Sequence, residues 1–208
     1  MSLPEYLTNG PDQAALTLAL AHGAGAPMDS PFMVAIAEGV AAAGFRVIRF
    51  EFPYMAEQRN TGAKKPPNPE RVLLDTWLAV ISDIGAERLV IGGKSMGGRM
   101  ASMVADASGV RGLACLGYPF HPPSRPEKLR TAHLANLQTP TLICQGERDP
   151  FGTPGEVAGY TLAKSIRLHW LKDGDHSLKP RKSSGRTETQ NLGEAAAAIV
   201  TFMRGLAA

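Results

Sequence analysis

Short apolar runs recur along the chain, and each is bounded by glycine, proline or polar residues. Runs of this length and composition are typical of strands buried inside a sheet. They predict strands over residues 15–21, 45–50, 88–92, 112–117, 139–145 and 165–171.

The segments between these runs carry apolar residues at helical spacing. Ser30-Pro31 is typical of a helix start, since an N-cap residue is followed by proline, and Gly44 ends the same segment. The pattern predicts helices over residues 30–43, 71–84, 96–107 and 193–206, a short helix over 127–137, and one that opens at 153 and runs to 162. We expect residues 51–70 and 172–191 to be irregular loops.

Alternation of strands and helices predicts an α/β fold. We expect a doubly wound, mostly parallel sheet of about six strands flanked by helices. No internal repeat or break in composition marks a second domain, so residues 1–208 are expected to form a single domain, with residues 1–13 as a polar lead-in. Few residues separate the fourth and fifth predicted strands, which leaves no room for a lid domain.

Composition narrows the class of protein. Of 208 residues, 44% are hydrophobic and 20% charged, as in an ordinary soluble globular protein, and a net charge of +3 is too weak to indicate a nucleic-acid partner. Cys115 and Cys144 both lie in apolar runs, which favours buried thiols and a reducing compartment. With no secretory signal and no run long enough to span a membrane, we expect a cytoplasmic protein without a membrane partner.

The third predicted strand leads into Gly93-Lys94-Ser95-Met96-Gly97. This G-x-S-x-G pattern is that of a nucleophile elbow, a strained strand-to-helix turn that exposes one serine hydroxyl. Glycines flank the serine because the tight turn leaves no room for side chains. Glycine-rich turns of this kind also bind phosphates, so the motif alone does not decide.

Chemically useful groups follow other strands, where functional residues of such sheets gather. Asp149 follows the fifth strand, His176 the sixth, and His22-Gly23-Ala24-Gly25 the first. A serine needs an imidazole to take its proton, and an acid fixes the tautomer of that imidazole. Backbone N–H groups of Ala24 and Met96 would complete an oxyanion hole. Asp173 and Asp175 are rival acids, but they are too close in sequence to His176 to approach its ring easily.

Together these stretches resemble the α/β-hydrolase superfamily, in particular small members without a cap that are related to dienelactone hydrolases. The chain is also similar to bacterial relatives of an animal testis-expressed protein and of a histone-acetyltransferase-complex subunit. The resemblance implies Ser95 as nucleophile, Asp149 as acid and His176 as base, with Ala24 and Met96 as oxyanion donors. Larger members have two further strands at the start. Residues 1–13 are too few and too polar to form both, so we expect a minimal sheet.

Other residues leave two interpretations open. Arg99 and Lys94 fit either structural salt bridges or contacts with an acidic substrate group. The aromatic residues that follow strand ends fit either the pocket lining or its rim, and they include Tyr54, Tyr118 and Phe120. A basic run after His176 fits either a solvated loop or an anion site, and it consists of Lys179, Arg181, Lys182 and Arg186. The helix face of Met96, Met100, Met103 and Val104 indicates core packing.

The sequence therefore predicts a serine hydrolase that cleaves an ester or thioester-like acyl substrate through an acyl-enzyme. No metal or cofactor is expected, and the partner is a small-molecule acyl substrate. Two alternatives stay open. The fold could serve as a non-catalytic interaction module, as a chromatin-complex relative would permit, or the same residues could run perhydrolase or carbon–carbon hydrolase chemistry.

Overall fold

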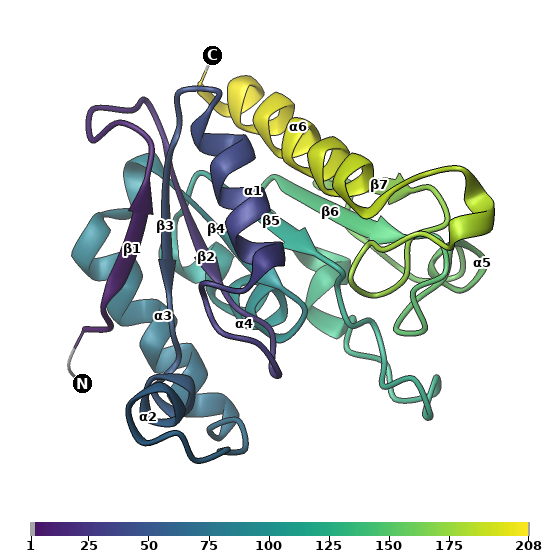
Figure 1. Cartoon of the computed structure of the whole chain (residues 1–208), viewed down its shortest axis with the longest axis horizontal. Helices are drawn as coiled ribbons and strands as arrows, with labels where there is room; N and C mark the ends of the chain where they lie inside the picture. The colour runs from purple at the N-terminus through teal and green to yellow at the C-terminus, as the bar shows by residue number, and fades with distance from the viewer. Residues whose placement is uncertain (1–2, 208) are drawn as a thin grey trace.

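The computed structural model describes residues 3–207, which form one sheet covered by helices (Figure 1). The strand order is β1-β3-β2-β4-β5-β6-β7, and only β1 runs antiparallel to its neighbour. The strands are β1 (Tyr6–Asn9), β2 (Thr17–Ala21), β3 (Arg46–Phe50), β4 (Leu89–Lys94), β5 (Gly112–Leu116), β6 (Thr141–Gly146) and β7 (Ile166–Leu171). The predicted doubly wound, mostly parallel sheet is confirmed.

The seventh strand, β1, corrects the prediction that residues 1–13 are only a lead-in. Tyr6 pairs with Phe50 and Asn9 with Val47, at the edge of the sheet. The two middle residues of β1 are exposed, so this strand needs no apolar run. Its stability comes from backbone pairing with β3, which a hydrophobic pattern does not reveal.

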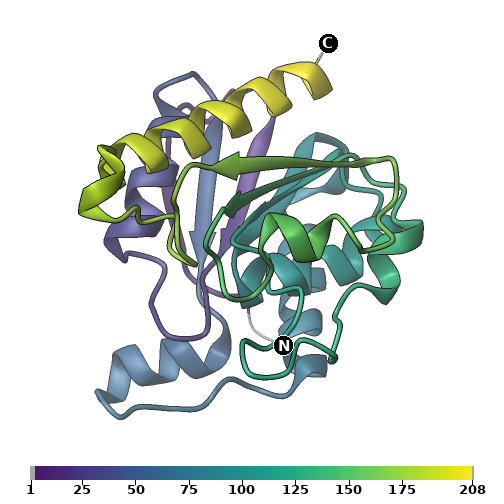
Figure 2. The same cartoon turned by 90° about the vertical axis from the view of Figure 1, so that its right-hand side faces the viewer.

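Helices cover both faces of the sheet, as Figure 2 shows for α6 on one side and the teal helices on the other. Packing pairs α1 with α6 on one face and α3 with α4 on the opposite face. The helices are α1 (Pro31–Ala41), α2 (Pro53–Thr61), α3 (Glu70–Ile84), α4 (Met96–Ser108), α5 (Pro154–Val157) and α6 (Glu188–Ala207), with 3-10 turns at Ala86–Arg88, Ala132–Asn136 and Lys182–Ser184.

Several predicted segments differ from the structure. The expected loop over 51–70 contains α2, a mostly polar helix that begins at Pro53 and ends at a left-handed Gly62. Its only buried residues are Tyr54 and Met55, so it lacks the apolar stripe by which helices are recognised. The predicted helix over 127–137 is reduced to a 3-10 turn, α5 ends at Val157, and α6 begins inside the expected loop 172–191.

Two apolar layers hold the helices to the sheet. On the α3–α4 side, the rings of Phe50 and Trp77 meet edge to face at 4.8 Å, and both are fully buried. The methionine face of α4 lies in this layer, as predicted, with Met100 only 1% exposed. Cys115 and Cys144 are free, buried thiols. Within residues 3–207, no helix is long and apolar enough to cross a membrane.

Parallel pairing places the carboxyl ends of β2, β4, β5, β6 and β7 at one edge of the sheet. The polar residues that follow these strands therefore meet there, although they are far apart in sequence.

Candidate active site

The turn between β4 and α4 presents Ser95 with backbone angles of φ 50° and ψ −112°, a strained conformation for a residue with a side chain. Two glycines make this turn possible because the end of β2 lies against it. A Cβ atom on Gly93 would come within 2.1 Å of the carbonyl oxygen of Ala21, and one on Gly97 within 2.5 Å of the same oxygen. Side chains are thus excluded mainly by the neighbouring strand.

His176 lies between Ser95 and Asp149. Its Nε2 atom is 2.9 Å from the Ser95 Oγ, and its Nδ1 atom is 2.8 Å from an Asp149 carboxylate oxygen. Since a carboxylate only accepts, Nδ1 carries the proton and Nε2 is left to accept from the serine hydroxyl. The ring of Phe151 stacks on His176 with centroids 4.1 Å apart, which fixes the ring plane.

Asp149 is fully buried and held from both sides. The Phe151 backbone N–H donates to one of its oxygens at 2.9 Å, and the Gln145 amide donates to the other at 2.9 Å. The rival acids are engaged elsewhere. Asp173 binds Arg181, whose hydrogen bonds lower the pKa of this carboxyl to about 2, and Asp175 accepts backbone N–H groups of its own turn.

The segment after β2 approaches Ser95 from the other side. Gly23 and Ala24 line a pocket together with Ser95 and His176. Met96 is the first residue of α4, where backbone N–H groups have no partner within the helix. The residues predicted to form a triad and an oxyanion hole are thus brought to one place.

Residues 14–204 match the family model described as an alpha/beta hydrolase domain. The chain belongs to the α/β-hydrolase family. Its seven-stranded, mostly parallel sheet with flanking helices is the α/β-hydrolase fold.

Several solved structures are similar to this α/β hydrolase. XC6422 from Xanthomonas campestris, described as a serine hydrolase without lid, has a TM-score of 0.70 at 18% identity and covers 96% of this chain and 88% of its own. Dienelactone hydrolase from Anabaena variabilis has a TM-score of 0.69 at 20% identity, covering 96% and 90%. A serine hydrolase homologue from Coxiella burnetii has a TM-score of 0.72 at 15% identity, covering 94% and 89%. At these identities the likeness shows the fold alone. In the structure described for residues 3–207, the connection between β5 and β6 contains only the 3-10 turn Ala132–Asn136.

The 22–30 loop of this α/β hydrolase, which contains Ala24, begins at a bracing histidine. His22 is fully buried, accepts the Phe52 backbone N–H on Nε2 at 3.1 Å and donates from Nδ1 to the Gly23 carbonyl at 2.6 Å. Burial lowers the pKa of His22, so the ring stays neutral and keeps both bonds.

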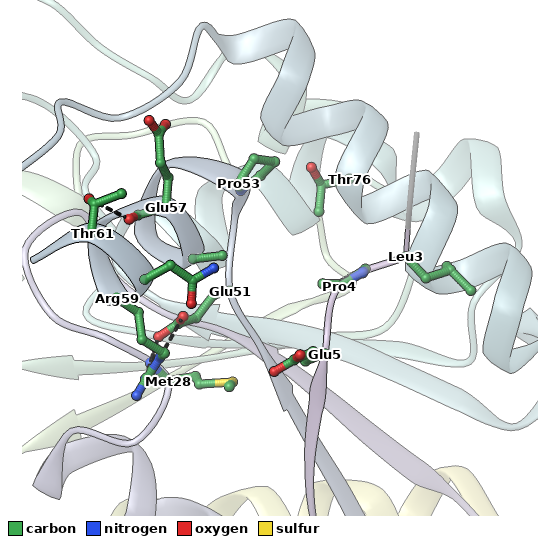
Figure 3. Close-up of a pocket in the computed structure, with 12 residues that line it drawn as sticks. Leu3, Pro4, Glu5, Met28, Glu51, Pro53, Glu57, Arg59, Thr61 and Thr76 are labelled. Carbon is green, nitrogen blue, oxygen red and sulfur yellow. Dashed lines mark hydrogen bonds and ion pairs between the residues drawn. The ribbon is translucent and has the colours of Figure 1, made fainter.

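The far side of the 22–30 loop is tied to α2 and β3. The buried Glu51 accepts the Met28 backbone N–H at 3.3 Å and pairs with Arg59 (Figure 3). Arg59 also forms a two-pronged pair with Asp29. The Tyr54 hydroxyl donates to the Ala24 carbonyl at 3.0 Å. These bonds fix the position of the 22–30 loop.

The residues expected to contact substrate lie outside the pocket. Tyr54, Tyr118 and Phe120 are at most 2% exposed, and neither they nor Arg99 line the cavity around Ser95. Tyr118 donates to the Arg130 carbonyl at 3.1 Å. Phe120 packs against Tyr118 and Tyr160, and Arg99 pairs with Glu70 at 3.0 Å. Following a strand end does not fix a side chain's direction, and these rings turn into the core.

The cavity itself, here called the Ser95 pocket, has a volume of about 510 Å³. Sequence reasoning missed Gln145 and the walls made by Phe32 and Phe151. A polar glutamine inside an apolar strand was the available signal for Gln145. The residues lining the pocket are Gly23, Ala24, Gly25, Ala26, Ser30, Pro31, Phe32, Met33, Lys94, Ser95, Phe151, His176, Ser177 and Glu188.

Most of the basic run after His176 is already neutralised. Lys179 pairs with Glu188, Arg181 with Asp173, and Arg186 with Glu194. The run therefore matches the solvated-loop interpretation better than an anion site. Among residues 3–207, no cluster of three or more His, Cys, Asp or Glu side chains could hold a metal ion.

Proposed function

We propose that this α/β hydrolase is a serine hydrolase that cleaves a small ester or thioester-like acyl substrate. The observation that carries the proposal is the unbroken hydrogen-bond chain from Asp149 through His176 to Ser95, which ends at the wall of the Ser95 pocket. A buried acid, an oriented imidazole and a hydroxyl in an open cavity are the parts that acyl transfer requires.

In the proposed reaction, the Ser95 oxygen attacks the substrate carbonyl while its proton passes to Nε2 of His176. The negative charge on the carbonyl oxygen is met by the backbone N–H groups of Ala24 and Met96. Asp149 stabilises the imidazolium. His176 then protonates the departing alcohol or thiol, which leaves an acyl group on Ser95.

In the second half of the reaction, the acyl group on Ser95 is hydrolysed, with His176 again acting first as base and then as acid. Water attacks the acyl carbonyl and gives a proton to His176, and the tetrahedral intermediate collapses as His176 returns a proton to Ser95. The products are a carboxylic acid and the free enzyme. Absence of a lid and a pocket of about 510 Å³ support short acyl groups over long chains.

A fluorophosphonate probe tests this proposal. We expect labelling of the wild type at Ser95, and no labelling of Ser95→Ala or His176→Ala, because the probe needs an activated serine. Ser102→Ala is the matched control. Ser102 also lies 2.8 Å from a histidine, His133, but it is 2% exposed. This variant should still be labelled.

The same experiment also tests the alternative function, a non-catalytic interaction module. A wild type that is folded by circular dichroism but stays unlabelled would favour a non-catalytic interaction module. Labelling that survives Ser95→Ala would show that the nucleophile lies elsewhere.

A further inference from the structure

Lys94 is the last residue of β4 and directly precedes Ser95. It lines the Ser95 pocket, where its Nζ atom donates to the backbone carbonyl of His176 and lies 5.5 Å from the centre of the Phe32 ring. In the part of the chain that the structure describes, no carboxylate lies within 4.0 Å of this ammonium group. One of its three N–H donors is used by a protein carbonyl, and the others remain for a ligand.

A partly buried cation without a counterion is costly, and proteins normally pair such groups. Burial lowers the pKa of the Lys94 ammonium to about 8, although Asp149 and Asp175 act in the opposite direction. The group is therefore still mainly charged near neutral pH. An anion that entered the pocket would supply the missing partner.

The other charged groups around the pocket are already paired. Glu188 lines the pocket, but it pairs with Lys179 at 3.4 Å. His176 is committed to Asp149. Lys94 is thus the pocket-lining cation left without an ion pair within residues 3–207.

A second feature of the pocket favours the same kind of ligand. The first turn of α1 forms part of the wall, through Ser30, Pro31, Phe32 and Met33. The N-cap residue Ser30 makes no side-chain hydrogen bond to this turn, and the turn holds no acidic residue. Free N–H groups and the helix dipole favour negative charge at such a place. Phe32, which lies under the Lys94 ammonium, joins the two features.

We propose that Lys94 and the first turn of α1 form an anion subsite, and that the preferred acyl substrate carries a carboxylate that binds there. A single carboxylate matches one lysine, whereas a doubly charged phosphate would leave charge unbalanced beside Glu188 and Asp175. The cleavage part of this inference rests on the proposed function, while binding of the carboxylate does not.

Paired substrates test the subsite. The half 4-nitrophenyl esters of glutaric, adipic and pimelic acid each have a neutral counterpart in which the free carboxylate is methylated. For the best chain length, we expect the wild type to favour the anionic ester, and Lys94→Met to lower the anionic-to-neutral ratio of kcat/KM by about tenfold or more. The ratio removes any effect that loss of the bond to His176 has on both esters.

Lys182→Met is the matched control, because Lys182 is an exposed lysine of the basic run. It should leave the ratio unchanged. An equal loss for both esters in Lys94→Met would mean that the lysine only holds His176, and would overturn the subsite. An equal drop of the ratio in Lys182→Met would point to the general field of the protein and would also overturn it.

Binding is measured without catalysis in the Ser95→Ala variant. By isothermal titration, monomethyl adipate should bind, and adding Lys94→Met should weaken its binding by about tenfold or more. If no ester is hydrolysed and no probe label appears, the proposed function fails and this titration still decides the subsite. If neutral esters are hydrolysed normally but monomethyl adipate does not bind, the subsite is overturned and the proposed function stands.

The subsite should also depend on pH. As the pH rises from 7 to 9, Lys94 loses its proton, so the anionic-to-neutral ratio should fall. Asp149, Asp175, His176 and Glu188 are the other titratable groups that face Lys94 or the pocket, and the neutral ester of each pair controls for their effect on catalysis. A ratio that stays constant across this range would contradict an ammonium as the recognition group.

Discussion

Two pockets of nearly equal volume share the 22–30 loop, and they differ in how their charges are used. The Ser95 pocket measures about 510 Å³, and a second cavity, here called the Arg59 pocket, measures about 540 Å³. In the Arg59 pocket the cation binds both Glu51 and Asp29, as Figure 3 shows for Glu51. In the Ser95 pocket the cation Lys94 has no carboxylate partner among the described residues.

The difference indicates a structural role for the Arg59 pocket and is consistent with the binding role proposed for the Ser95 pocket. Volume does not distinguish the two cavities, but charge pairing does. Where the cation and the buried carboxylate of a cavity are already paired with each other, a ligand has little to gain from that cation, and the pair serves to hold the fold. Where a hydroxyl and an ammonium stay available in a cavity, chemistry and recognition become possible. We expect changes at the two pockets to affect different properties.

The largest expected effect lies in the Ser95 pocket. Asp149→Asn should lower kcat/KM for a short activated ester by about 10³-fold to 10⁴-fold, because an amide does not stabilise the imidazolium and favours the wrong tautomer of His176. Steady-state kinetics give the rate, and circular dichroism checks the fold.

Glu57→Gln in the Arg59 pocket is the matched control. Glu57 is exposed and pairs with Lys65 at 2.7 Å, so both rate and stability should stay near those of the wild type. An Asp149→Asn variant that keeps more than a tenth of the activity would rule out Asp149 as the triad acid.

A smaller effect on rate and a clear one on stability are expected for Arg59→Met. The change leaves Glu51, which is 4% exposed, without its cation, so the free energy of unfolding should fall by about 2–4 kcal/mol. The 22–30 loop also loses an anchor, and kcat should fall by about tenfold. Urea denaturation and steady-state kinetics measure the two quantities.

The double variant Glu51→Gln with Arg59→Met sharpens this test. Removing the unpaired carboxylate should restore most of the stability but not the rate. A stability loss with unchanged kcat would show that the Arg59 pocket does not position the loop.

The smallest expected effect is that of Tyr54→Phe. Loss of the hydroxyl that donates to the Ala24 carbonyl should lower kcat about threefold to tenfold with little change in KM, and lower the free energy of unfolding by about 1 kcal/mol. Tyr160→Phe is the control, since its partly buried ring packs against Phe120 and lies outside the 22–30 loop. Similar losses in both variants would argue against a specific role for Tyr54.

The parts of the fold that bury apolar surface could be predicted from the sequence. The six parallel strands are short apolar runs, and their ends place Ser95, Asp149 and His176 at one edge of the sheet. Those positions follow from topology, since parallel strands end on the same side. Segments held by polar contacts could not be found in this way. β1 relies on backbone pairing, and α2 is held by bonds from Tyr54 and Arg59.

The direction of a side chain was harder to predict than its place in the chain. Tyr118 follows β5 and Lys94 ends β4, so both were candidates for contact with substrate. The ring of Tyr118 turns into the core, whereas the Lys94 ammonium reaches the pocket. This choice depends on the twist of each strand end and on neighbouring residues, which a single sequence does not show.

Gly117, the residue that follows β5, lies against both Lys94 and His176. Gly117 adopts a left-handed conformation with φ +63°, and a Cβ atom there would lie 2.8 Å from both the Lys94 Nζ and the His176 carbonyl oxygen. A single methyl group at this position would push against the Lys94 ammonium and the His176 backbone at once. Position 117 is therefore sensitive to substitution. Even an alanine side chain there would displace Lys94 and His176, although it lies outside the Ser95 pocket.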